Sequence, residues 1–321
     1  MRGRLLLGTL LIFGVLAPAA WATSVKPPHA SSKLSIQGAF SVQRQTVTVV
    51  GRPVTVAGTV RPYVPGQSVI VRAYVGRQLI SQRRLGVRAS HGGSYGYYSE
   101  QLGSPIAGQV SIVATHSATS LLGAFRATQG FGALDSAVGF GATGRFVELL
   151  QQRLAALHFY IPQTGVYDQG TGLALDAYHR LLRWGTYQTL DHQTVTWLLN
   201  GWGAFKVRYP RDGRHAEGNL SIQLLALIDH GAVQRIYPIS SGKPSTPTIL
   251  GRFQVYSKVP GYLPDGMYFS NFFIGGYAIH GYDPAPDYPA SHGCMRVPIV
   301  DAISIYDWLR IGNRVDVYYG G

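Results

Sequence analysis

The first third of the chain alternates apolar and polar residues at the period of a half-buried strand. Val54, Val56 and Val60 would lie on one face of such a strand. Short runs of this kind, separated by Gly- and Pro-containing turns, predict about seven strands at a spacing typical of a sandwich. Residues 33–128 are therefore predicted to form a β-sandwich that is immunoglobulin-like by architecture, acting as a spacer or adhesion module.

The period changes to that of amphipathic helices in the middle of the chain. Val147, Leu150 and Leu154 would share one helical face, and Asp191 is placed to cap a later helix. Three short helical patterns follow one another here. Residues 135–200 are therefore predicted to form a small three-helix bundle.

Strand patterns return in the last third. Two apolar runs on either side of His230-Gly231 predict a hairpin, and residues 298–309 have the spacing of one helix that ends before Gly312. Residues 204–321 are therefore predicted to form a mostly-β domain with one principal helix. The whole chain is predicted to be a multidomain α+β protein.

The N-terminus reads as a secretory signal peptide over residues 1–22. Arg2 and Arg4 precede an apolar stretch, and Ala20-Trp21-Ala22 is a cleavage site of the A-x-A type. The alternative is an uncleaved N-terminal anchor, although the apolar stretch is short for a membrane span. We expect an exported protein of the cell wall or periplasm, with residues 23–32 as a flexible linker.

Composition and charge narrow the possible partners. The formal net charge is +13, which favours an anionic surface such as an anionic wall polymer, although generic basic charge explains it equally well. The basic residues are scattered and no nucleic-acid motif accompanies them, so nucleic acid is not expected as a partner. The single cysteine and the absence of zinc-type Cys/His spacing predict no structural metal, and no cofactor is expected.

The candidate chemistry gathers around that single cysteine. Cys294 follows His292 and Gly293 directly, and His280 lies fourteen positions upstream. A thiol attacks as its thiolate, so it needs a nearby base or a positive field. An imidazole with an ordinary pKa of about 6.5 can supply that base, but spacing does not decide which histidine does so. The alternative is a buried cysteine that acts only as a small hydrophobe.

The segment from His280-Gly281 to Ser291-His292-Gly293-Cys294-Met295-Arg296 resembles the motif of the L,D-transpeptidases, the YkuD-type catalytic domain of bacterial cell-wall synthesis. The resemblance extends back to about Lys206. It includes the run from Ser241-Gly242-Lys243 to Phe253, in which Ile249 stands where the family usually has proline. It also includes an aromatic segment from Met267-Tyr268 to Phe273.

This resemblance implies roles for individual residues. Cys294 would be the nucleophile, and His280 would be the base, oriented by the carbonyl of Gly281. His292 would line the site, and the backbone N–H groups of His292, Gly293 and Cys294 would face the oxyanion. The substrate-binding residues would be Arg296, Ser291, Tyr268 and Met267. Arg296 would meet a substrate carboxylate or fix the cysteine loop, and Ser291 would fix that loop by hydrogen bonding rather than react. Tyr268 and Met267 would shape the donor groove; the alternative is that they belong to the core. The family reaction joins peptidoglycan stem peptides by 3→3 cross-links through a thioester.

Residues 147–179 are similar to the peptidoglycan-binding domain 1 repeat, although Tyr178-His179 replaces the usual Phe-Gln. The similarity implies that the helical segment binds glycan; the alternative is a helical spacer that binds nothing. Three functions stay open. They are a cross-linking transpeptidase, an L,D-carboxypeptidase or wall-protein-anchoring enzyme that uses the same site, and a non-catalytic wall-binding protein.

Overall fold

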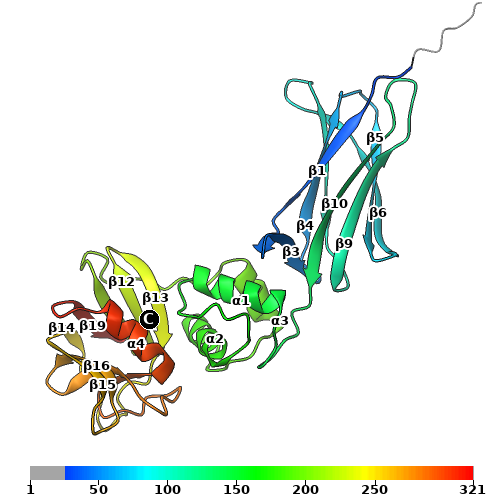
Figure 1. The fold of residues 1–321 in the computed structure, drawn as a ribbon. Helices are drawn as coiled ribbons and strands as arrows, with labels where there is room; N and C mark the ends of the chain where they lie inside the picture. The colour runs from blue at the N-terminus through cyan, green and yellow to red at the C-terminus, as the bar shows by residue number, and fades with distance from the viewer. Residues whose placement is uncertain (1–25, 321) are drawn as a thin grey trace, which may run out of the picture.

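A computed structural model of the chain describes residues 26–320 (Figure 1). The expected signal peptide at residues 1–22 lies outside the described residues, as does part of the expected linker. Figure 1 shows three parts in chain order, with helices between an N-terminal group of strands and a C-terminal part made of strands and one helix. The described chain is mostly β and has four helices. None of its helices within residues 26–320 has the length and apolar character needed to cross a lipid bilayer.

Two sheets form the N-terminal part, in the strand orders β1-β4-β8-β7 and β2-β3-β10-β9-β5-β6. Their strands are β1 Ser31–Gln37, β2 Phe40–Val42, β3 Gln45–Val49, β4 Val54–Arg61, β5 Ser68–Val75, β6 Gln78–Gly86, β7 Arg88–Ala89, β8 Gly96–Leu102, β9 Gly108–His116 and β10 Phe125–Leu134. As the alternation predicts, Val54, Val56 and Val60 are all buried, and they pack with residues of β5, β9 and β10 in one apolar cluster.

The strands differ in number and extent from the prediction of about seven. Strand β6 was not predicted, because it is mostly polar and exposed, as suits its place at the edge of the larger sheet. Strand β10 runs on to Leu134, past the expected boundary at residue 128, and β1 begins at Ser31, inside the expected linker.

Three helices follow, with bounds α1 Arg145–Ala156, α2 Gln169–Leu182 and α3 His192–Leu199. The predicted cap on α3 is confirmed, because the Asp191 carboxylate accepts a hydrogen bond of 2.6 Å from the Thr194 backbone N–H. Asp168 caps α2 in the same way, through the Thr171 N–H at 2.9 Å. The first turns of α2 and α3 are therefore fixed by aspartate caps, whereas α1 begins after Gly144 without a side-chain cap.

These helices do not close on one another as an independent bundle. The apolar cluster around Leu150, Leu175 and Tyr178 also contains Leu224 and Ile236, which belong to strands of the C-terminal sheet. A backbone exchange joins the same two parts, since the N–H of Tyr160 donates to the carbonyl of Ile236 at 3.0 Å. The helical segment therefore shares its core with the C-terminal domain.

The C-terminal domain has two sheets and one helix. Its elements are β11 His215–Asn219, β12 Leu224–Asp229, β13 Ala232–Pro238, β14 Gly251–Gln254, β15 Ser257–Tyr262, β16 Tyr268–Ile274, β17 Tyr277–Gly281, β18 Met295–Val297, α4 Ile299–Trp308 and β19 Arg314–Tyr318. The sheet orders are β13-β12-β11-β19-β14 and β15-β16-β17-β18. Residues of both sheets and of α4 pack into one apolar core. Helix α4 is the single principal helix that the sequence predicted for this domain.

Candidate active site

Two parallel strands bring the cysteine and the histidine motifs together. Strand β18 pairs with β17 so that Arg296 lies opposite His280, and Cys294 stands immediately before β18. The Ala278 backbone N–H donates to the Cys294 sulfur at 3.4 Å, and the thiol donates to the Gly276 carbonyl at 3.6 Å. Cys294 is partly exposed, so a substrate can reach it.

Ser291 holds the loop that carries the cysteine. Its side chain is fully buried, and its hydroxyl donates to the Cys294 carbonyl at 2.6 Å while accepting from the Gly293 N–H at 3.0 Å. The Ser241 carbonyl accepts from the N–H groups of Ala290 and Ser291, both at 2.9 Å. The Gly293 N–H is therefore taken up by the Ser291 hydroxyl, which differs from the oxyanion role expected for it.

Gly293 is a position at which only glycine fits. Its φ of 118° lies in the region that side-chain-bearing residues avoid, and a Cβ there would overlap the ring of Tyr277. The aromatic ring thus packs directly on the backbone beside Cys294.

The His280 ring is buried, with 2% of its surface exposed. Its Nδ1 lies 2.9 Å from the Gly281 carbonyl oxygen, which can only accept, so Nδ1 carries the proton and the neutral ring keeps a free lone pair on Nε2. Burial, reinforced by the Arg296 cation, lowers the pKa of His280 to about 4 and outweighs the hydrogen bond to Gly281. The ring is therefore neutral near pH 7 and able to accept a proton.

The pKa of the Cys294 thiol is shifted in the opposite direction to that of His280. Burial raises the pKa of the Cys294 thiol above its ordinary value, against the opposing effects of the Ala278 N–H and the Arg296 cation. Within the described residues, the hydrogen bonds of the sulfur go to backbone groups and none joins it to His280. The resting pair is thus a neutral thiol and a neutral imidazole, so the thiol has to lose its proton before or during attack.

The other predicted site residues lie around this pair at different depths. The Arg296 guanidinium stacks over the Tyr282 ring at 3.9 Å. His292 is exposed, and its Nε2 lies 3.4 Å from the Lys243 Nζ. Met267 is buried with 7% of its surface exposed.

Tyr268 is half-buried and packs on the Tyr262 ring at a centroid distance of 4.3 Å. It lies on β16 opposite Gly281 of β17, so the aromatic segment borders the strand that carries His280.

Several contributors were not found from the sequence. Gly276 and Ala278 act through backbone groups, which leave no mark on residue type, and Tyr277 is recognisable only from its contact with Gly293. Gln223 is a further case, because its amide accepts from the Ser241 N–H and donates to the Ser241 hydroxyl, both at 2.9 Å. No group of three or more metal-binding side chains occurs within residues 26–320.

Comparison with known proteins identifies the family to which the chain belongs. The model of the L,D-transpeptidase catalytic domain matches residues 213–317. A crystal structure of an L,D-transpeptidase from Xylanimonas cellulosilytica is 31% identical with a TM-score of 0.52, over 56% of this chain and 97% of that one. This chain therefore belongs to the L,D-transpeptidase family.

A second structure extends the comparison. The NMR structure of the catalytic domain of an E. faecium L,D-transpeptidase acylated by ertapenem is 26% identical, with a TM-score of 0.29, over 33% of this chain and 97% of that one. Among the curated proteins, none matches the chain.

Proposed function

We propose that this protein is a peptidoglycan L,D-transpeptidase that forms 3→3 cross-links through a thioester on Cys294. The observation that carries the proposal is the state of His280. Its Nδ1–H is held by the Gly281 carbonyl, its Nε2 is free, and its low pKa keeps it neutral beside the strand that presents the thiol.

The reaction begins with proton transfer from the Cys294 thiol to Nε2 of His280 as the sulfur attacks the donor peptide carbonyl. The N–H groups of His292 and Cys294 stabilise the oxyanion that forms. The imidazolium then protonates the departing amine, and a thioester remains. The acceptor amine attacks this thioester, gives its proton to His280 and forms the new peptide bond as the thiolate leaves and recovers the proton.

Substrate contacts follow from the positions of the surrounding residues. Arg296 supplies a cation close enough to influence both His280 and Cys294, which suits a substrate carboxylate. Tyr268 and Met267 border the donor groove in this proposal, and Ser291 keeps the cysteine loop in register.

The remaining parts of the chain have roles that fit an exported wall enzyme. We take residues 33–128 as an immunoglobulin-like β-sandwich spacer, since two sheets there bury a common apolar cluster. Residues 135–200 are proposed as a peptidoglycan-binding segment, and residues 1–22 as a signal peptide. Residues 204–321 form the catalytic domain.

The test combines a covalent probe with product analysis. Intact mass measurement with ertapenem should show one adduct on the wild-type chain and none on Cys294→Ala. Incubation with a defined tetrapeptide muropeptide should then yield 3→3 dimers. Release of the terminal residue without dimers would identify a carboxypeptidase instead, and adduct formation by Cys294→Ala would remove the nucleophile from the proposal.

A further inference from the structure

A cavity of about 350 Å³ lies where the helical segment meets the catalytic domain, well separated in sequence from the cysteine motif. Its lining includes Arg183, just after α2, together with Lys206 and Arg208 of the segment that enters β11. Among residues 26–320, none that lines it is an aspartate or a glutamate. Three cationic side chains thus share one hollow, and no described side chain in its lining is a carboxylate.

Two of these cations are fixed in place. The Arg208 guanidinium donates to the Tyr319 carbonyl at 3.2 Å and lies over the Tyr318 ring at 4.6 Å. The Arg183 guanidinium donates to the Gly320 carbonyl at 3.2 Å. A guanidinium has five N–H groups, so each arginine keeps further donors for a ligand while its position is already set.

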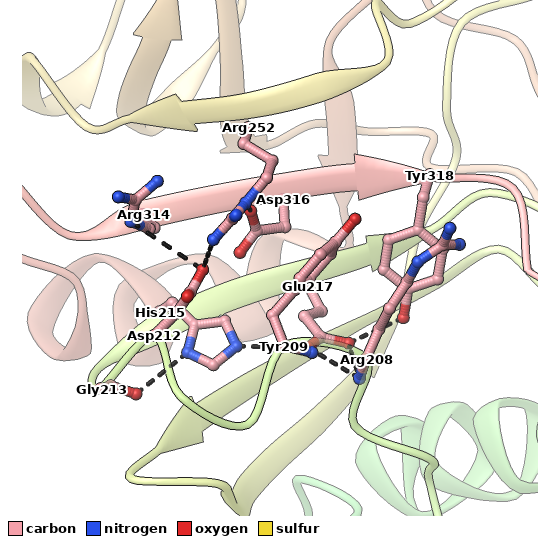
Figure 2. Close-up of polar contacts among 10 residues, drawn as sticks. All are labelled: Arg208, Tyr209, Asp212, Gly213, His215, Glu217, Arg252, Arg314, Asp316 and Tyr318. Atoms are coloured by element: carbon pink, nitrogen blue, oxygen red, sulfur yellow. Dashed lines mark hydrogen bonds and ion pairs between the residues drawn. The ribbon is translucent and has the colours of Figure 1, made fainter.

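A buried carboxylate explains why Arg208 is held there. Figure 2 shows the Glu217 carboxylate accepting from the backbone N–H groups of Arg208 and Tyr209, from the Tyr318 hydroxyl and from the His215 ring. Burial alone would raise the pKa of Glu217, but these hydrogen bonds outweigh it and hold the pKa below its ordinary value. Glu217 is therefore an ionised positioning residue whose own charge is already satisfied.

The hollow also continues along the seam between the two parts. A neighbouring cavity of about 270 Å³ shares Arg183 and Ile222 with the first and reaches Ser221 and Gln223 of the catalytic domain. Its lining also includes one carboxylate, that of Asp287, so the cationic part of the seam is the end that holds Arg183, Lys206 and Arg208. An extended groove of this kind suits a chain with repeated charges better than a single small ion.

We propose that this seam binds a phosphate-bearing anionic polymer through Arg183, Lys206 and Arg208. Fixed guanidiniums match phosphate oxygens in bidentate fashion, and three cations favour a ligand that carries several charges. The identification of the ligand as a wall polymer rests on the proposed function. The binding of a phosphate-bearing ligand at the seam rests on the cavity and the three cations that line it.

A second basic cavity gives the matched control. Arg72, Arg77 and Arg126 line a hollow of about 370 Å³ on the N-terminal sheets. The full-length chain would be titrated with a labelled glycerol-phosphate oligomer, and affinity compared for Arg183→Gln/Arg208→Gln and for Arg77→Gln/Arg126→Gln. Both variants lose two charges, so generic attraction weakens both equally. A direct N–H contact to a charged group is worth roughly tenfold or more, so the seam variant alone should lose at least that factor.

The same protein variants test the seam site independently of the proposed catalytic function. Ertapenem acylation of Cys294 should be unchanged in the seam variant, so failure of either proposal is visible without the other. Equal losses in the two variants would overturn the seam site, and equal or tighter binding of poly-L-glutamate would overturn the choice of phosphate. If the seam variant has a lowered thermal midpoint, Lys206→Gln, whose side chain is exposed, gives the decisive comparison.

Discussion

Replacing His280 with alanine should slow acylation of Cys294 far more than it alters folding. Loss of a general base costs about 10²–10⁴ in rate, which corresponds to roughly 3–5 kcal/mol of barrier. His292→Ala is the matched control, because that ring is exposed and its hydrogen bond among the described side chains is to Lys243. Its acylation rate should stay within about threefold of wild type, since its backbone N–H is retained.

The pH profile makes this prediction sharper. With its pKa at about 4, His280 is roughly 90% neutral at about pH 5, whereas a histidine of ordinary pKa would be only about 3% neutral there. The wild-type acylation rate should therefore fall by less than about twofold between roughly pH 7.5 and pH 5, against about 30-fold for an ordinary histidine. The base is present above its folded-state pKa and is lost only as the pH falls through about 4.

Stopped-flow fluorescence or timed intact-mass measurement with ertapenem provides the rate. A fall of roughly tenfold per pH unit would mean that the thiol loses its proton to solvent before attack, because a thiol of raised pKa then supplies thiolate in proportion to hydroxide. That result, or an equal loss in His280→Ala and His292→Ala, would refute the assignment of His280 as the base.

Three further substitutions test the surroundings of the site. Gly293→Ala should reduce acylation of Cys294 by about 100-fold at nearly unchanged secondary structure by circular dichroism, because the new methyl group meets Tyr277 and displaces the sulfur. Ser291→Ala should cost about 2 kcal/mol of stability by removing two buried hydrogen bonds, measured by denaturant unfolding; an unchanged midpoint would contradict this. Burial raises the pKa of Asp301 to about 8, so between about pH 4 and pH 8 this carboxyl ionises in the unfolded chain but stays protonated in the folded one, and the fold loses stability progressively as the pH rises. Asp301→Asn should raise the thermal midpoint near pH 8 and leave it unchanged near pH 4.

The chemistry of the site was predictable from sequence to the extent that it depends on residue type. Cys294 stands out because a lone thiol beside histidine and glycine is chemically distinctive, whereas His280 was preferred to His292 as the base only through the family resemblance. The state of the pair was not predictable, because the pKa shifts come from burial and from Arg296 across the strand pair. The use of the Gly293 N–H by Ser291 likewise depends on the conformation of the loop.

The same division holds for the fold. Strand β4 was predicted because alternation records burial on one face, and α3 because Asp191 has the chemistry of a cap. The apolar core that the helices share with the C-terminal sheet was not predicted, although the sequence of β12 is consistent with it. Its residues 224–228 are apolar and buried without alternation, which is typical of a strand covered on both faces.

Because β12 is buried on both faces, it determines the smallest fragment of the chain that can stay soluble and folded on its own. Shortening the chain to residues 213–317 would remove the helices that cover Leu224, Ala226 and Ile228. The face of the sheet that carries these residues would become an exposed apolar surface prone to aggregation. A working enzyme fragment therefore has to begin ahead of Arg145. Substitutions on the helical segment are constrained in the same way, since the core that they would alter also contains Leu224, Ala226, Ile228 and Ile236 of the C-terminal sheet.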